Sequence, residues 1–238
     1  MIMLNNDIDR HTTYELYDNN INEEATMTDI IVKGNKTKAK GYLPEIGDKA
    51  ADFKLTKTDL SDIGLGDFKG KNIILNIFPS IDTAVCAASV RRFNTEVAKI
   101  DGTVVLCVSL DLPFAHGRFC AAEGINNVVS VSAFRSPDFI KNYGLVIDEG
   151  PLKGLLARYV VAIDTTGTIV YSETSKDLSE EPDYEEVVAC ITKPMKEVPA
   201  PASSDKKQLP LDRCLHPESA EDSRIFNDDE PCDDGRAG

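Results

Sequence analysis

Hydrophobic and polar positions divide the chain into a patterned middle and two unpatterned ends. Residues 1–26 and 194–238 lack a sustained apolar period, and both are rich in acidic residues. Composition of this kind is typical of disordered chain. We therefore predict a disordered acidic N-terminal arm over 1–26, one folded domain over 27–193 and a disordered acidic C-terminal tail over 194–238.

Short apolar runs alternate with helix-like patterns through the predicted domain. Residues 73–78 and 103–110 are apolar and rich in β-branched side chains, which predicts two buried strands. Between them, residues 83–100 carry apolar side chains at three- and four-residue spacing, which predicts a helix. A hairpin is predicted over 159–171 around a turn at 164–167. This order of elements predicts an α/β domain with three layers around a central mixed sheet.

The remaining patterns are shorter, and each is bounded by turn or capping residues. They predict an N-terminal strand that leads into a Gly-Asn turn at 34–35, helices over 113–123, 137–143 and 183–191, and a strand over 127–131.

Charge and composition narrow the classes of function. The net charge is −14 without a basic stripe, which argues against nucleic acid or an anionic membrane as the main partner. The chain has no run of 18 apolar residues and no secretory signal pattern at its start, so we expect a cytoplasmic protein. Six cysteines occur without a CxxC pair, which argues against a zinc finger or a thioredoxin-type site.

Cys86 is the best candidate for chemistry on its placement alone. A predicted strand ends at Phe78, a loop containing Pro79 follows, and Cys86 falls in the first turn of the next helix. The N–H groups and the dipole of a helix N-terminus favour the thiolate, which is the reactive form of cysteine. Thr83 is close enough for its hydroxyl to reach the sulfur or a bound oxygen. A cysteine in this place can equally be a small buried hydrophobe, and placement leaves both interpretations open.

Three segments, in this order, resemble the bacterial thiol peroxidases, an atypical two-cysteine subfamily of the peroxiredoxins. They are PSIDTAVCAASVRRFN at 79–94, DLPFAHGRFCAAEG at 111–124 and GPLKGLLARYVVAID at 150–164. The first fits the peroxiredoxin pattern of Pro, three residues, Thr or Ser, two residues and Cys through Pro79, Thr83 and Cys86. The resemblance covers about residues 27–193 and implies a thioredoxin-like fold with an N-terminal β-hairpin extension.

The resemblance implies a role for each matching residue. Cys86 resembles the peroxidatic cysteine, whose thiolate attacks the peroxide and becomes a sulfenic acid. Thr83 resembles the residue that hydrogen-bonds the thiolate and the peroxide, and Arg158 the residue that stabilises charge on the sulfur and on the breaking O–O bond. Pro79 resembles the residue that shields the sulfur from solvent. Cys120 resembles the resolving cysteine, which closes an intrachain disulfide with Cys86 that thioredoxin reduces.

From this resemblance we expect a thioredoxin-dependent peroxidase that reduces hydrogen peroxide and alkyl or lipid hydroperoxides, needs no cofactor or metal, and forms a homodimer. Apolar residues 112–114 lie in the segment that resembles the substrate loop. Because the Cα atoms of a disulfide lie within about 7 Å of each other, we expect local opening around Cys86, Cys120 or both during each cycle. The alternatives are a peroxide-sensing redox relay and a binding module with an inactive site.

The other cysteines and a nearby histidine are expected to play no part in catalysis. Cys107 and Cys190 lie among apolar residues and are expected to pack in the core. His116 is expected to face solvent on its helix. The cysteines and the histidine of the tail, within 214–232, fall short of the four ligands of a structural zinc site.

Overall fold

The computed structural model describes residues 26–98, 100–175 and 177–192. Residues 1–25 of the predicted arm, the predicted tail and the tail residues Cys214, His216 and Cys232 lie outside these residues, whereas residue 26, the last of the predicted arm, begins the first strand. The boundaries of the folded domain therefore stay predictions.

A seven-stranded mixed sheet lies at the centre of the fold, with the strand order β10-β9-β5-β6-β7-β3-β4. Its strands are β3 (Lys54–Lys57), β4 (Asp62–Gly64), β5 (Asn72–Ile77), β6 (Thr103–Ser109), β7 (Val129–Ser132), β9 (Tyr159–Ile163) and β10 (Ile169–Thr174). β5, β6 and β7 are parallel, whereas β9 pairs antiparallel with β5 and with β10. The mixed sheet and the late hairpin are as predicted.

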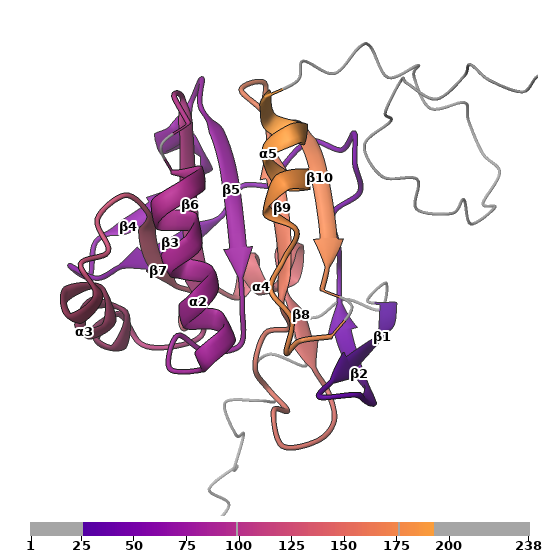
Figure 1. Cartoon of the computed structure of the whole chain (residues 1–238). Coiled ribbons are helices and arrows are strands. Elements are labelled where there is room, and N and C mark those ends of the chain that lie inside the picture. The colour runs from indigo at the N-terminus through magenta and orange to yellow at the C-terminus, as the bar shows by residue number, and fades with distance from the viewer. Residues whose placement is uncertain (1–25, 99, 176, 193–238) are drawn as a thin grey trace, which may run out of the picture. The chain divides into compact units, whose positions relative to one another are not determined.

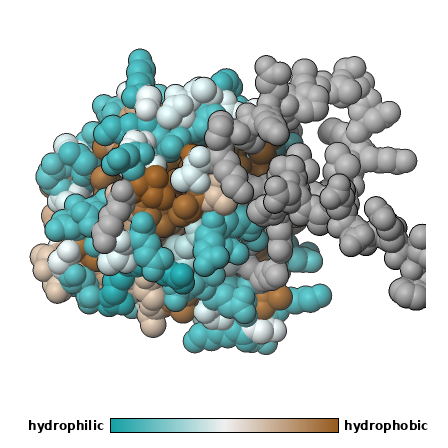
Figure 2. Space-filling model, turned by 45° about the horizontal axis from the view of Figure 1, so that its top comes forward, coloured by the Kyte–Doolittle hydropathy of each residue, from teal (hydrophilic) through white to brown (hydrophobic). Residues whose placement is uncertain are grey.

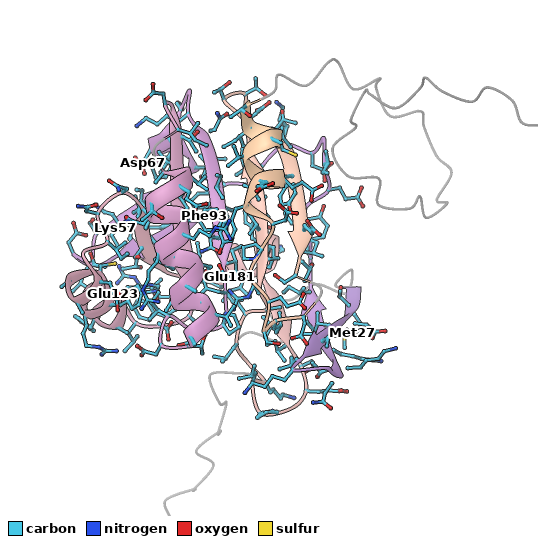
Figure 3. All side chains as sticks on the ribbon, in the orientation of Figure 1. Met27, Lys57, Asp67, Phe93, Glu123 and Glu181 are labelled. Carbon is cyan, nitrogen blue, oxygen red and sulfur yellow. The ribbon has the colours of Figure 1, made fainter. Side chains whose placement is uncertain are left out.

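Helices cover both faces of this sheet and make the predicted three layers. They are α2 (Ala84–Arg92), α3 (Pro113–Glu123), α4 (Pro137–Tyr143) and α5 (Tyr184–Thr192). Figure 1 shows α2 and α5 in front of the sheet, α4 behind it, and α3 at the flank near β4 and β7. Phe93 packs against Tyr184 of α5 with ring centroids 4.9 Å apart, and Figure 3 shows Phe93 on the side of its helix nearer α5. With helices on both faces, β5 and β6 are almost wholly buried, which explains their continuous apolar sequence.

The outer surface is mostly polar. Figure 2 shows hydrophilic side chains over most of one face, with a smaller group of apolar side chains among them. Within the part of the chain that the structure describes, no helix combines the length and apolar character that a bilayer crossing requires.

A second sheet contains the predicted N-terminal hairpin. It has three strands in the order β1 (Thr26–Val32), β2 (Asn35–Gly41) and β8 (Leu145–Ile147). The hairpin turn is Lys33–Gly34 rather than the predicted Gly34–Asn35, and both turn residues have positive φ angles, 51° and 77°. Two such residues suit the twist of a tight hairpin. Strand β8 was not predicted from the sequence.

Other elements differ from the prediction in length. The helix predicted over 83–100 is an α-helix only to Arg92 and continues as a π-helix, η2 (Phe93–Val97). The Ala98 N–H donates to the Phe93 carbonyl at 2.9 Å, which is the five-residue spacing of a π-helix. A short hairpin of β3 and β4, followed by the 3₁₀-helix η1 (Leu65–Phe68), was not predicted.

Candidate active site

Cys86 lies in the first turn of α2 and is fully buried. Strand β5 ends at Ile77, and the Phe78 N–H still donates to the Val108 carbonyl of β6 at 3.0 Å. The chain then turns through Pro79, and Thr83 occupies the N-cap position of α2. The strand, the turn and the helix together place a thiol at the end of α2 where backbone N–H groups lack helical partners.

The guanidinium of Arg158 lies against this thiol. Nη2 of Arg158 is 3.1 Å from the Cys86 sulfur, and Nε donates to the Leu178 carbonyl at 3.2 Å. Arg158 is only 1% exposed, and its Nη1 has no hydrogen-bond partner among the described residues. A guanidinium keeps its positive charge under all ordinary conditions, so a permanent positive charge lies beside the Cys86 sulfur. The unpaired N–H groups of Nη1 can hydrogen-bond an oxygen atom brought to the sulfur.

Thr83 and Pro79 lie in the loop before Cys86. Pro79 is buried. The Thr83 hydroxyl donates to the Ser80 carbonyl at 3.0 Å, and no hydrogen bond joins it to the sulfur in the described part of the chain. Both residues thus lie in the segment that leads to Cys86, and the Thr83 hydroxyl is engaged within that segment.

Cys120 lies on α3 and is half-buried, and its thiol donates to the Ser130 hydroxyl of β7 at 3.2 Å. Cys86 and Cys120 are both free thiols. Arg158 immediately precedes β9, and β5 and β6 lie between β9 and β7. At about 4.8 Å per strand, β9 and β7 are about 14 Å apart. The two thiols are thus held by partners at separate places on the sheet.

A partly buried polar network joins the loop before Cys86 to the start of α3. The Asp111 carboxylate accepts hydrogen bonds from the Ser80 hydroxyl (2.9 Å), the Ile81 N–H (2.7 Å) and the Ser109 hydroxyl (2.7 Å). Ser109 also lies 3.0 Å from Nε2 of His116. Because the one hydroxyl proton of Ser109 goes to Asp111, Nε2 is the donor in this contact. No pattern along the sequence predicted this network.

His116 is buried, so the prediction that it faces solvent is wrong. Burial lowers the pKa of His116 to about 4, because an imidazolium ion would be poorly solvated there. The imidazole is therefore neutral at physiological pH, and its Nδ1 has no hydrogen-bond partner among the described residues.

The remaining described cysteines lie away from the contacts of Cys86. Cys107 is buried in β6, and burial raises its pKa to about 12, which makes it an inert thiol. Cys190 is buried on α5 as expected, and it is disulfide-bonded. No group of three or more His, Cys, Asp or Glu side chains suited to a metal ion occurs within 26–98, 100–175 and 177–192.

Residues 45–188 match the family described as Redoxin. Over 159 residues the chain is 50% identical to the thiol peroxidase of Corynebacterium glutamicum, and this match covers 67% of the chain and 96% of that protein. The chain is a thiol peroxidase of the redoxin family. This membership confirms the resemblance seen in the sequence and the expectation of a peroxidase enzyme.

Solved structures of relatives confirm the thioredoxin-like fold. A peroxiredoxin-like protein from Aquifex aeolicus matches with a TM-score of 0.64 and 39% identity, covering 68% of this chain and 95% of that one. The thiol peroxidase from Chromobacterium violaceum matches with a TM-score of 0.60 and 22% identity, covering 67% and 92%; at this identity it supports the fold alone.

Proposed function

We propose that this thiol peroxidase reduces hydroperoxides through Cys86, that Cys120 resolves the oxidised sulfur, and that thioredoxin reduces the resulting disulfide. The buried contact of 3.1 Å between Arg158 and the Cys86 sulfur carries this proposal, because it puts a permanent positive charge beside a thiol at a helix N-terminus. Pro79 is proposed to keep water from the sulfur, and Thr83 to turn its hydroxyl toward an incoming peroxide.

In the first step, the Cys86 thiolate attacks the outer oxygen of the peroxide. An S–O bond forms as the O–O bond breaks, so the sulfur is oxidised to a sulfenic acid and the peroxide is reduced. The departing oxygen takes up a proton and leaves as water or an alcohol. Negative charge grows on that oxygen in the transition state, and the Nη1 donors of Arg158 are available to stabilise it.

In the second step, the Cys120 thiolate attacks the sulfenic sulfur. A disulfide forms, and the sulfenic oxygen leaves as water after protonation. One of the two helices has to open, because the two thiols are held by different partners. The dithiol of thioredoxin then reduces the disulfide by exchange, which needs no metal or cofactor.

The surface at the start of α3 suggests the kind of substrate. Leu112 and Phe114, at the start of α3, are 51% and 65% exposed. Exposed apolar side chains of this size suit an alkyl or lipid hydroperoxide or the face of a homodimer. We propose that the enzyme takes such hydroperoxides as well as hydrogen peroxide, acts in the cytoplasm as a homodimer, and keeps its activity in residues 27–193.

A coupled assay tests the proposal. Consumption of cumene hydroperoxide and hydrogen peroxide is followed with thioredoxin, thioredoxin reductase and NADPH. Turnover should vanish in Cys86→Ser and lose its dependence on thioredoxin in Cys120→Ser, whereas Cys107→Ser serves as the matched control with an inert thiol. Full activity in Cys86→Ser would overturn the site. Single oxidation of Cys86 without turnover in the wild type would favour the redox relay instead.

A further inference from the structure

The turn of the N-terminal hairpin β1–β2 is hydrogen-bonded to the loop that connects β10 to α5. Its two residues, Lys33 and Gly34, point their N–H groups at the carboxylate of Asp177, at 3.0 and 2.8 Å. The carboxylate also accepts hydrogen bonds from the N–H and the hydroxyl of Ser179. Figure 1 shows this orange connection between β10 and α5 running down beside the hairpin β1–β2.

Leu178, which lies between Asp177 and Ser179, links the hairpin to the active site. The Leu178 N–H donates to the Ile31 carbonyl of β1 at 2.8 Å, and the Leu178 side chain is buried in the core. The Leu178 carbonyl accepts the Nε hydrogen bond of Arg158. The same guanidinium holds the Cys86 sulfur through Nη2. A continuous chain of contacts therefore runs from the hairpin turn to the thiol.

We propose that Asp177 is a positioning residue for peroxide reduction. By fastening the hairpin turn to the loop, Asp177 fixes the Leu178 carbonyl, which in turn sets the orientation of the Arg158 guanidinium against Cys86. The inference rests on the proposed roles of Arg158 and Cys86, and it gives the N-terminal hairpin a function in the active site.

The Leu178 carbonyl matters because the guanidinium has few other anchors. Among the described residues, that carbonyl and the Cys86 sulfur are its hydrogen-bond partners. The N–H donors of a guanidinium lie in one plane. The hydrogen bond from Nε to the Leu178 carbonyl fixes this plane, and it therefore sets the direction of the hydrogen bond from Nη2 to the Cys86 sulfur. A neutral carbonyl also leaves the positive charge of Arg158 uncompensated, so that the charge acts on the sulfur and on the peroxide oxygens.

Asp177 stays ionised wherever the enzyme can be assayed. Hydrogen bonds from Ser179, and then from the backbone of Gly34 and Lys33, lower the pKa of Asp177 to about 2. Any pH dependence that a variant changes above pH 4 therefore belongs to another group.

The test is the pH dependence of Cys86 reactivity in Asp177→Asn. Alkylation of Cys86 by iodoacetamide is measured from pH 4 to 9 in the full chain and is resolved by peptide mass spectrometry. The amide cannot accept all four hydrogen bonds, so the loop loosens and less thiolate forms. We expect the pH midpoint to rise by about half a unit to one unit, which makes alkylation and peroxide reduction about three- to tenfold slower below the midpoint. The limiting rate of alkylation at high pH should not fall, because every Cys86 thiol is then a thiolate in both proteins.

Asp164→Asn is the matched control. At the opposite end of β9 from Arg158, Asp164 caps the β9–β10 turn in the same manner, accepting the N–H groups of Thr166 and Thr168 and the Thr166 hydroxyl. Asp164→Asn should lower the melting temperature about as much as Asp177→Asn does, but it should not move the pH midpoint of Cys86 alkylation. Ser179→Ala removes only one donor to Asp177 and should shift the midpoint in the same direction by less.

Two outcomes would overturn the inference: an unshifted midpoint in both Asp177→Asn and Ser179→Ala, or an equal shift in Asp164→Asn. If Asp177→Asn does not fold, the shift in Ser179→Ala decides. Absence of peroxide turnover in the wild type would instead defeat the proposed function. The alkylation midpoint would still decide whether Asp177 orients Arg158 against Cys86.

Discussion

The two helices that carry the thiols of the proposed mechanism, Cys86 and Cys120, are held to the domain in different ways. Helix α2 and the π-helix after it bury a continuous row of side chains: Cys86, Ala87, Ser89, Val90, Phe93, Asn94 and Val97. Helix α3 has 11 residues, yet only Pro113 and His116 are buried along it. Much of what joins α3 to α2 is polar: the ion pairs Arg91–Glu123 and Arg118–Asp82, and the Asp111 network. Figure 3 shows Glu123 on α3, at the flank of the domain.

This difference matches what each thiol is proposed to do. A nucleophile at a helix N-terminus works best if its charge partners are fixed, and the packing of α2 keeps Cys86 in contact with Arg158. A resolving thiol has to travel, and a helix with little buried apolar surface opens at a low free-energy cost. We therefore expect α3, rather than the body of α2, to open during each cycle.

The largest expected effect comes from removing the charge beside Cys86. Arg158→Met should lower the rate constant for peroxide reduction by about a hundredfold or more, since it removes donors from the developing charge. The free energy of unfolding should fall by about 1–3 kcal/mol, because the Leu178 carbonyl loses its buried hydrogen bond from Arg158. The rate constant is measured by quenching the reaction at several peroxide concentrations. The free energy of unfolding is measured by urea unfolding.

Arg135→Met is the control for this change. Arg135 is also hydrogen-bonded, to Thr56 and Asp62, but it lies on the surface near β3 and β4. A rate loss in Arg135→Met as large as that in Arg158→Met would mean that the contact with Cys86 is not what matters.

The second prediction concerns the packing of α3 and depends on pH. The folded protein does not protonate His116 until the pH approaches about 4, whereas the unfolded chain does so near 6.5. Between these values the unfolded chain binds more protons, so stability falls as the pH falls. Between pH 7 and pH 5 this difference removes about 2 kcal/mol from the free energy of unfolding. Because glutamine does not titrate, the free energy of unfolding of His116→Gln should fall by about 2 kcal/mol less than that of the wild type between pH 7 and pH 5.

Urea unfolding of both proteins under reducing conditions at pH 7 and pH 5 measures this difference. Carboxylates titrate alike in the two proteins, so the comparison isolates His116. An identical pH dependence in the wild type and in His116→Gln would show that the imidazole is accessible to protons in the folded state.

Much of the fold could be predicted from the sequence because the elements have strong local signals. The helix over 113–123 begins with proline and ends at Gly124, whose positive φ of 64° suits glycine, and its bounds agree with the structure. Strand β8 escaped prediction because its three residues form a strand only by pairing with β2. The π-helix also carries no local signal, since one changed hydrogen bond distinguishes it from an α-helix.

The residues of the candidate site also differ in whether the sequence predicted them. Cys86 and its loop form one continuous segment, so both the resemblance and the placement pointed to them. Asp111 and Asp177 act through contacts with residues far away in sequence, up to 144 positions apart, and no pattern along the chain records such contacts. His116 was misjudged because a helix of mixed polarity gives no clear buried face, although it follows the buried Pro113 by three residues.

The smallest expected effect comes from the surface links between α2 and α3. Arg118 lies 3.0 Å from Asp82, and both side chains are mostly exposed, so the pair contributes little. Arg118→Gln should speed closure of the disulfide between Cys86 and Cys120 by no more than about twofold, and added salt should have a similar effect on the wild type. Because the chain has no tryptophan, closure is followed by rapid acid quench, thiol alkylation and mass spectrometry after a single peroxide pulse. Slower closure in Arg118→Gln would mean that this ion pair guides α3 toward Cys86 rather than holding it in place, and α3 would then not be the loosely held element that its burial indicates.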